Sequence, residues 1–386
     1  MRIAITTPTT WPYVTRGGER FVNELAAFLA SRGHDVTVLA GSPERAVPKT
    51  QRGYITRYHR RWWHPSLGKV GIVEAHAFMA SCFPRLLMGR YDVVQCTTFL
   101  DTYAATVARR VTGTPCAFWV NSIPTGVKYI RSLSVGGGIF RRAVRDVDEI
   151  VSLSEYVWSY LDGRFGRGGI VLPVPVDTDR FQPVECAWRP EIVCAAQLDD
   201  QRKGGSVLMA AFNGVKRVWP DATLNLVGGA SDHTRSTMLS VVAPEWRHDV
   251  TFCKCASDEV RQAFSRAAVS VLPSLWESFG MVVLESMACG TPVVGTRHGA
   301  LPELIPGSVG RLFDPGTLEG ASPTNVEGLT TALLEALELS RNPNTRQLCR
   351  AHAEQFSWSM VGPRFEQLYE RLTAGTAVRQ SARRFA

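Results

Sequence analysis

Short apolar runs alternate with amphipathic segments along most of the chain, as in proteins built from strands and helices in turn. The chain opens with an apolar run at Arg2–Thr6. Helical periodicity follows over Glu19–Ser31, stops before Gly33, and gives way to a second apolar run at Asp35–Ala40. Three further runs in this half predict strands: Asp92–Thr97, Cys116–Asn121 and Glu149–Ser154. Strands separated by helices pair in parallel, so this half predicts a doubly wound α/β domain.

A proline-rich stretch, Leu172–Val184, interrupts the alternation before a second series begins. The second series has apolar runs at Glu191–Leu198, Ala222–Gly229, Val250–Cys255 and Ala267–Ser274. A chain of 386 residues also exceeds one ordinary core. We therefore predict an α/β protein with two Rossmann-like, doubly wound domains facing a cleft. The predicted boundaries are 1–172 for the first domain, 173–188 for a hinge, 189–360 for the second domain, and 361–386 for a C-terminal helix and basic tail returning to the first domain.

Two glutamates frame the start of a predicted helix in "WESFGMVVLESMACGTPVVG", Trp276–Gly295. The helix is predicted over Gly280–Cys289, directly after the strand at Ala267–Ser274. Glu277 lies in the loop at the carboxyl end of that strand, where open α/β sheets bind ligands. Glu285 lies inside a helix that is apolar on nearly every side, where an ionised carboxylate needs a partner. The pair therefore points to a binding site.

This segment combines an anion site with acceptors for hydroxyl groups. Backbone N–H groups near Phe279, Gly280 and Met281, at the predicted helix start, can bind an anion. Carboxylates beside them accept hydrogen bonds from hydroxyls. A ligand that carries both phosphate and a polyol is a nucleotide sugar, and we predict that this segment binds one.

Composition places the chain among globular proteins without a metal centre. Apolar residues make up 45% of the chain and charged residues 20%. No run of eighteen apolar residues predicts a membrane span, and the N-terminal residues predict no signal peptide. Nine cysteines are scattered without the spacing of a metal site. We expect no metal, no cofactor, and a location in the reducing cytoplasm.

The positive charge is concentrated in the first half. Residues 1–176 contain 22 Lys and Arg against 12 Asp and Glu, whereas the remainder contains 21 against 23. The excess includes "RYHRRWWHP", Arg57–Pro65, and "FRRAVR", Phe140–Arg145. An anionic acceptor or an acidic membrane surface would explain it, and so would an ordinary solvated face rich in arginine. No nucleic-acid-binding motif accompanies the charge, so we expect no nucleic acid partner.

Five motifs in order resemble those of the retaining glycosyltransferases of family 4, which have the fold called GT-B. The most specific is the E-x7-E pattern of Glu277 and Glu285 within "PSLWESFGMVVLESMACGTPVVG". The supporting motifs are "GGERFVNELAAFLASRGHDVTVLA", "LPVPVDTDRFQP", "LDDQRKGGSVLMAAF" and "GALPELI". The resemblance covers nearly the whole chain. It implies transfer of a hexosyl group from a UDP- or GDP-sugar to an acceptor hydroxyl, with retention and without a metal.

The resemblance also implies roles for individual residues. Glu277 would hold the donor sugar, Glu285 the ribose hydroxyls, and Lys203 the diphosphate. The implied catalytic set is Glu277, Lys203 and Asn121. The implied donor-binding set is Gly17, Gly18, Gln197, Arg202, Lys203, Lys254, Cys255, Glu277, Ser278, Phe279, Gly280, Met281, Val282 and Glu285. In the family the acceptor attacks the face that the diphosphate leaves, so no protein nucleophile is expected.

Two of the predicted site positions depart from the usual residues of the family. Gln197 stands where an arginine is usual, and Arg202 is the candidate to supply the missing charge. Asn121 stands where a histidine is common. Two alternatives therefore stay open: a nucleotide-sugar epimerase on the same architecture, and a protein that binds a nucleotide sugar without catalysis.

The acceptor is less well defined by the sequence than the donor. The basic first half fits a lipid-linked or otherwise anionic glycan acceptor and peripheral contact with the inner face of an anionic membrane. A small natural-product aglycone is also open, and Asp101 is an acid that could receive a cationic acceptor. The oligomeric state is not predicted. The D-x-D motif at Asp146–Asp148 is assigned to the surface, because it precedes a strand and so lies at the wrong end of the sheet for a ligand.

Overall fold

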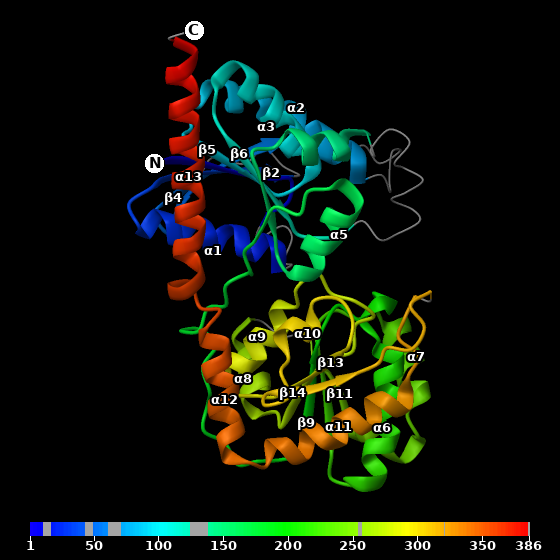
Figure 1. Cartoon of the computed structure of the whole chain (residues 1–386). Coiled ribbons are helices and arrows are strands. Elements are labelled where there is room, and N and C mark those ends of the chain that lie inside the picture. The colour runs from blue at the N-terminus through cyan, green and yellow to red at the C-terminus, as the bar shows by residue number, and fades with distance from the viewer. Residues whose placement is uncertain are drawn as a thin grey trace. The chain divides into compact units, whose positions relative to one another are not determined.

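A computed structural model describes residues 1–10, 17–42, 49–60, 71–123, 138–253, 257–319 and 321–384. The chain divides into two compact units (Figure 1). The first unit comprises Met1–Pro173 together with Val361–Ala386, and the second comprises Val174–Met360. No helix in the described ranges is long and apolar enough to cross a bilayer.

The first unit contains a sheet of eight strands in the order β3-β4-β2-β1-β5-β6-β7-β8. All neighbours pair in parallel except β3 and β4, which are antiparallel. The strands are β1 (Arg2–Thr7), β2 (Asp35–Ser42), β3 (Lys49–Gln51), β4 (Tyr54–Arg60), β5 (Val93–Cys96), β6 (Cys116–Val120), β7 (Glu149–Ser152) and β8 (Ile170–Val171). Strands β1, β5 and β6 are almost entirely buried, which explains their continuous apolar runs.

Helices cover both faces of this sheet. The helices are α1 (Gly17–Ser31), α2 (Gly71–Met88), α3 (Phe99–Thr112), a helical segment at 138–146, α5 (Glu155–Phe165) and α13 (Trp358–Arg384). Buried side chains of α2, α3, the 138–146 segment and α5 form one core cluster with the sheet. On the other face α1 packs through Phe21, whose ring lies 4.4 Å from that of Trp119 on β6 and 5.6 Å from that of Phe365 on α13.

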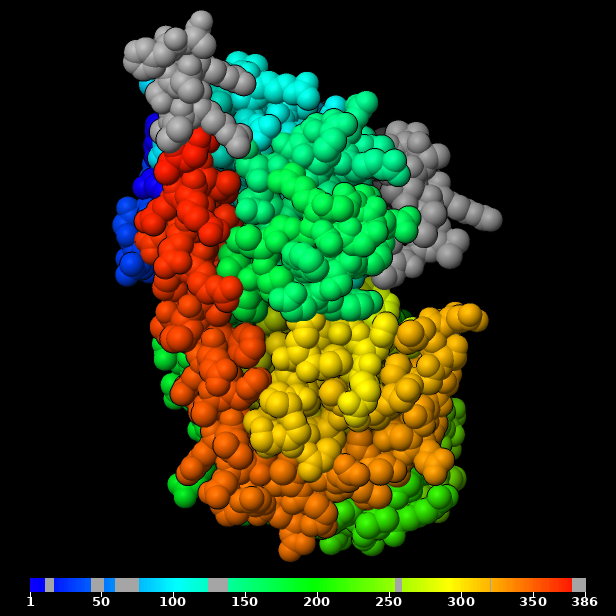
Figure 2. All heavy atoms as spheres, viewed as in Figure 1, coloured from blue at the N-terminus to red at the C-terminus, as the bar shows by residue number. Residues whose placement is uncertain are grey.

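The last helix, α13, packs along the first unit, where Figure 2 shows it in red on the surface. The buried hydroxyl of Tyr369 donates a hydrogen bond of 3.0 Å to the Gln95 side chain on β5. Glu366 accepts from His34 at 2.9 Å and from Arg32 at 3.2 Å, at the end of α1. These polar contacts fix α13 in register against the sheet.

The second unit contains six parallel strands in the order β11-β10-β9-β12-β13-β14. They are β9 (Glu191–Ala195), β10 (Thr223–Val227), β11 (Val250–Cys253), β12 (Val269–Leu272), β13 (Val293–Thr296) and β14 (Gly310–Phe313). The helices are α6 (Gly205–Val218), α7 (Asp232–Val241), α8 (Ser257–Arg266), α9 (Met281–Ala288), α10 (Leu301–Leu304), α11 (Val326–Ser340) and α12 (Pro343–Glu354). Short 3-10 turns occur at Gln201–Lys203 and Pro244–Asp249.

The two Rossmann-like sheets predicted from the sequence are confirmed, with strand ends displaced by a few residues. The prediction missed β4, because its second half, Arg57–Arg60, was interpreted only as the start of the basic stretch Arg57–Pro65. Tyr54 and Thr56 of β4 are buried, and β4 pairs in parallel with β2. The basic residues Arg57, His59 and Arg60, which follow these buried positions, hide the strand from a search for apolar runs. The rest of that stretch, 61–65, lies outside the described residues.

Candidate active site

The candidate site of the second unit lies where the order of its strands reverses. Strands β9 and β12 are neighbours, with Ile192 opposite Val269, although β10 and β11 intervene in sequence. The chain winds from β9 towards β10 on one side and from β12 towards β13 on the other. In open α/β sheets, ligands bind at such a reversal, beside the loops that leave the carboxyl ends of the strands. These loops contain Gln197–Gly204 and Pro273–Gly280.

A cap and a glycine bring the two loops into contact. The Asp200 carboxylate accepts from the backbone N–H of Arg202 at 3.1 Å and begins the turn Gln201–Lys203. Gly204 ends this turn at φ 72°, and a Cβ there would overlap the carbonyl oxygen of Pro273. Only glycine allows both the left-handed conformation and this close approach. As a result, the N–H of Leu275 donates to the Arg202 carbonyl at 2.8 Å.

Lys203 and Glu277 meet across these loops. Lys203 Nζ donates to Glu277 Oε1 at 2.6 Å, and their side chains are only 19% and 13% exposed. A partly buried ammonium and carboxylate in contact attract more strongly than a pair in water. Together they present a cation and a hydrogen-bond acceptor from adjacent positions, as a ligand with phosphate and hydroxyl groups requires.

A third loop holds the backbone of Glu277. The N–H of Ala300 donates to the Glu277 carbonyl at 2.9 Å. Gly299 lies at φ 69°, and a Cβ there would approach that carbonyl oxygen to 2.7 Å. The adjacent His298 is partly buried, and this burial lowers the pKa of its imidazole. The sequence did not indicate that the Gly299–Ala300 backbone supports Glu277.

Helix α9 begins directly after the loop Pro273–Gly280, which contains Glu277. Gly280 is its N-cap at φ 104°, and its eight residues end at Ala288. The first N–H groups of a helix have no partner within the helix, so this end can bind an anion. Ser278 and Phe279 precede the helix and are buried, whereas Met281 and Val282 in its first turn are partly exposed. Glu285 lies one turn further on and is 5% exposed.

Arg202 and Gln197 occupy different surroundings from Lys203. The Arg202 guanidinium lies 4.4 Å from the Trp276 ring centroid and donates to the Trp276 carbonyl at 2.7 Å and to Asp200 at 3.1 Å. Its charge is therefore engaged within the loops. Gln197 is exposed, and its amide lies against Gly229, after β10. Neither the stacking on Trp276 nor the contact with Gly229 was predicted, because both join residues distant in sequence.

The remaining predicted residues belong to the first unit or lie outside the described ranges. Gly17 and Gly18 begin α1, and a Cβ on Gly18 would lie 3.9 Å from Asn121 Nδ2. Asn121 is exposed and directly follows β6. The structure thus brings Gly18 and Asn121 together within this unit. Residues 254 and 255, the predicted Lys254 and Cys255 positions, lie outside the described residues.

Asp101, which the sequence suggested as an acceptor ligand, is held by hydrogen bonds within the first unit. Asp101 is fully buried, accepts hydrogen bonds from the hydroxyls of Thr6 and Thr98, and caps the start of α3. Burial raises the pKa of its carboxyl. The suggestion that Asp101 receives a cationic acceptor is therefore wrong, because the side chain is inaccessible. Its hydroxyl partners come from β1 and from the loop before α3.

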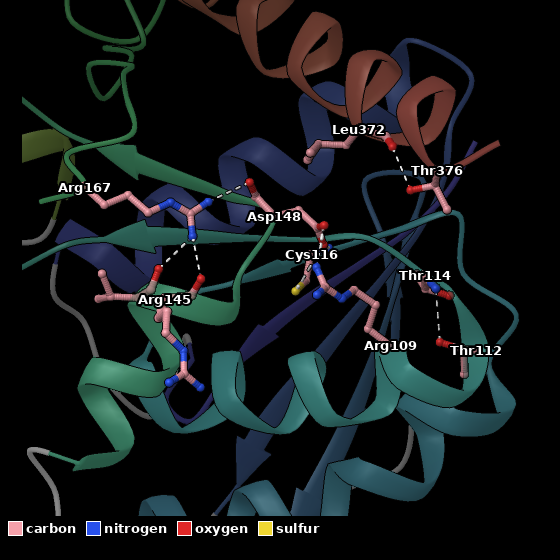
Figure 3. Close-up of polar contacts among 10 residues, drawn as sticks. Arg109, Thr112, Thr114, Cys116, Arg145, Asp148, Arg167, Leu372 and Thr376 are labelled. Carbon is pink, nitrogen blue, oxygen red and sulfur yellow. Dashed lines mark hydrogen bonds and ion pairs between the residues drawn. The ribbon is translucent and has the colours of Figure 1, made fainter. Parts of the chain in front are cut away.

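The acids of the D-x-D motif form ion pairs with arginines at the amino ends of β6 and β7, and Figure 3 shows the surroundings of Asp148. Asp148 pairs with Arg109 and accepts from the N–H of Cys116 at 3.0 Å. Asp146 pairs with Arg145 at 2.6 Å, and this hydrogen bond lowers the pKa of its carboxyl. The motif lies at the end of the sheet that was predicted. Assigning both acids to the surface was wrong in detail, because Asp148 is 14% exposed and bonds to the sheet backbone.

No three His, Cys, Asp or Glu side chains within the described ranges are grouped so that they could hold a metal ion. The polar groups at the candidate site are instead one ammonium, two carboxylates and the amides of a helix start.

Comparison with known proteins identifies the class of the chain. The sequence profile described as "Glycosyltransferase Family 4" matches residues 15–180, and that described as "Glycosyl transferases group 1" matches residues 189–339. The sucrose-phosphate synthase of Thermosynechococcus elongatus has a similar structure, with a TM-score of 0.78 at 20% identity over 97% of this chain and 99% of that one. The fold is GT-B, and the protein is a glycosyltransferase.

Two relatives match the chain along nearly its full length. An MMP alpha-(1->4)-mannosyltransferase of Mycolicibacterium hassiacum is 28% identical over 92% of this chain and 95% of its own. A phosphatidyl-myo-inositol mannosyltransferase of Mycobacterium leprae is also 28% identical, over 98% of this chain and 99% of its own. The chain belongs to glycosyltransferase family 4.

Proposed function

We propose that this protein is a retaining, metal-independent hexosyltransferase that uses a nucleoside diphosphate sugar, with mannose as the favoured sugar. The observation that carries the proposal is the Lys203–Glu277 contact at the strand-order reversal, beside the start of α9 and one turn from Glu285. A cation, helix amides and two carboxylates suit a diphosphate flanked by two polyols. The names of both full-length relatives favour mannose.

Each group has a part in the proposed reaction. The bond between the anomeric carbon and the diphosphate oxygen breaks, and the acceptor oxygen bonds to that carbon on the same face. Lys203 and the first N–H groups of α9 stabilise the negative charge that grows on the departing diphosphate, where a preorganised charge is most effective. Glu277 holds sugar hydroxyls and Glu285 holds ribose hydroxyls. The family resemblance assigns Gly17, Gly18 and Asn121 of the first unit to the donor as well.

The cationic groups also support activity without a divalent metal or another cofactor. Lys203 and the helix start supply positive charge at the diphosphate, which is the task that Mg²⁺ performs in other phosphate sites. Gln197 brings no charge, and Arg202 is engaged by Asp200 and Trp276, so most of this work falls to Lys203.

For the acceptor we propose a lipid-linked, anionic molecule presented at the inner face of the cytoplasmic membrane, with the protein bound there peripherally. The Mycobacterium leprae relative is named for a phosphatidyl-myo-inositol acceptor. The excess of cations in residues 1–176 is consistent with an anionic surface. A small natural-product aglycone is the alternative acceptor.

The test is incubation of the purified protein with GDP- and UDP-hexoses, in EDTA, with and without vesicles that contain phosphatidylinositol. We expect an α-linked product from an α-linked donor, because retention preserves the anomeric configuration, and NMR of the product determines it. Epimerised donor without transfer would support an epimerase. Binding without turnover would support a non-catalytic protein. An inverted product would overturn the proposed retention. Activity restored only by added magnesium would overturn the proposed metal independence.

A further inference from the structure

Helix α12 packs against α9 and directs two arginines towards its carboxyl end. Arg350 Nη1 lies 3.1 Å from the carbonyl oxygen of Ala288, the last residue of α9. Arg346 Nη2 lies 3.4 Å from the carbonyl oxygen of Cys289. The last carbonyl groups of a helix have no partner within the helix and carry its negative dipole end, so cations there stabilise the helix.

The same arginines hold the segment by which the chain enters the second unit. Arg350 Nη1 donates to the carbonyl oxygens of Phe181 at 2.7 Å and Thr178 at 3.0 Å. Arg346 contributes a longer contact to Val184, at 3.4 Å. One guanidinium nitrogen of Arg350 therefore joins the end of α9 to the turn at 178–181. We call residues 177–184 the entry segment.

The entry segment is ordered by further contacts of its own. Asp177 accepts from the backbone N–H groups of Phe181 and Arg180, both at 2.9 Å. The Phe181 side chain is 2% exposed and packs against the ring of Phe264 on α8. A buried anchor and a closed turn transmit a displacement instead of absorbing it, because close-packed groups have few alternative arrangements. A small movement at the end of α9 would therefore reach the entry segment.

Helix α9 is short enough for its two ends to act on each other. Eight residues span about 12 Å. The N–H groups at its start belong to the candidate diphosphate site, Glu285 lies three residues before Ala288, and Arg350 contacts the far end. A shift of α9 along its axis displaces Glu285 and the first N–H groups together, because the backbone hydrogen bonds of the helix keep them at fixed relative positions.

We propose that Arg350 is a positioning residue that sets the axial position of α9 and couples nucleotide binding at the start of α9 to the entry segment. This inference rests on the proposed function, since it requires the nucleoside diphosphate to bind at α9. Arg350 touches no reacting atom in this account. It acts through Glu285 and through the helix amides.

Coupling of this kind is reciprocal, so it has two measurable consequences. Loss of Arg350 should weaken nucleotide binding, and nucleotide binding should stabilise the entry segment in the wild type. Since ribose contacts change little during the reaction, the first effect should raise the donor KM more than it lowers kcat. A defect in folding alone would not link the ligand to hydrogen exchange at residues 180 and 181.

The experiment compares the full-length wild type with Arg350→Met, Arg350→Lys and the control Arg341→Met. Arg341 is a 60%-exposed arginine of the same unit whose side chain pairs with Glu338 at 3.5 Å. GDP and UDP are titrated by calorimetry, and hydrogen exchange of the entry segment is measured with and without the nucleotide that binds. We expect Arg350→Met to raise the Kd about fivefold or more, the lower range of typical coupling factors.

We expect Arg350→Lys to restore part of the affinity, because it keeps a cation at the helix end, and Arg341→Met to behave like the wild type. Bound nucleotide should slow exchange of the entry segment in the wild type and much less in Arg350→Met. Should Arg350→Met fail to fold, Arg350→Lys carries the test, since lysine cannot bridge both sets of carbonyls and should still uncouple exchange. Normal binding with equal slowing in all four proteins, or no slowing in the wild type, would overturn the coupling alone. A wild type that binds neither nucleotide would overturn the proposed function and the coupling with it.

Discussion

Replacement of Lys203 by methionine removes the cation that contacts Glu277 while keeping most of the side-chain length. Lys203 Nζ is 2.6 Å from Glu277 Oε1 in the structure, at the point where the diphosphate is proposed to bind. Removing one preorganised group that stabilises charge in a transition state costs about 10²–10³ in kcat, or roughly 2.7–4 kcal/mol. We therefore expect Lys203→Met to lower kcat by about a hundredfold or more at saturating donor.

A loss of stability is a second consequence, and it has to be separated from the first. Glu277 is 13% exposed and would lose its partner, which costs about 1–3 kcal/mol for a buried polar group. Glu277→Gln removes the charge that needs the partner, so the stability effects of the two changes should not add. Thermal unfolding of both single variants and the double variant measures this coupling. If the variants are folded at the assay temperature, the loss of kcat reports on chemistry.

The assay is initial-rate transfer from the best donor, with Lys203→Arg and Arg202→Met as comparisons. Lys203→Arg should keep part of the activity, because the positive charge remains within reach. Arg202→Met should cost less than Lys203→Met, because Arg202 is engaged by Trp276 and Asp200. Near-normal kcat in Lys203→Met with a severe loss in Arg202→Met would refute the assignment and make Arg202 the diphosphate ligand.

Three other predictions follow from the same site and surfaces. Glu285→Gln should raise the donor KM more than it lowers kcat, because ribose binding is uniform through the reaction; an unchanged KM with a much lower kcat would contradict the role. Gly204→Ala should lower the free energy of unfolding by more than about 1 kcal/mol, whereas Gly307→Ala, where a Cβ meets open space, should change it little; equal melting temperatures would contradict the backbone argument. Salt should raise the acceptor KM before the donor KM, and replacing the exposed Arg141 and Arg142 by Ser should mimic salt and reduce retention on anionic vesicles; equal kinetics and retention would make these arginines an ordinary solvated face.

Much of the fold could be predicted because its central strands are buried on both faces. Strands such as β9 and β12 read as short continuous apolar runs, and Pro273 directly follows β12. The strands near the edge of the first sheet were harder to predict from the sequence. Strand β4 carries Arg57 and His59 after its buried positions Tyr54 and Thr56, and its pairing with β2 becomes visible only in three dimensions. Periodicity therefore identifies central strands better than strands near the edge of a sheet.

The candidate site was predictable to the extent that it rests on local sequence. Glu277 and Glu285 attract notice because they occupy an apolar strand–loop–helix segment. Their surroundings depend on residues far away: Lys203 lies 74 positions from Glu277, and Arg350 lies 62 positions from Ala288. No local pattern encodes these distances, because they are set by the order of strands in the sheet and by the packing of α12 on α9.

The ion pairs of Asp148 and the capping role of Asp101 illustrate the same limit. From the sequence, Asp148 was interpreted as a surface residue of the D-x-D motif and Asp101 as an acid that could bind an acceptor. Arg109 of α3 pairs with Asp148, and hydroxyls from β1 and the loop before α3 donate to Asp101. The short sequence motif specifies residue types, whereas the partners that decide their role come from the tertiary fold.

The central claim is that a nucleoside diphosphate sugar binds at the carboxyl edge of the second sheet, on Lys203, the start of α9 and Glu285. A crystal structure of the full chain with GDP or UDP bound tests it most directly. The account predicts diphosphate oxygens within about 3 Å of Lys203 Nζ and of a backbone N–H at the start of α9, and ribose hydroxyls donating to Glu285 at a similar distance. A nucleotide bound elsewhere in the second unit, or bound here without contact to Lys203 and Glu285, would contradict the account.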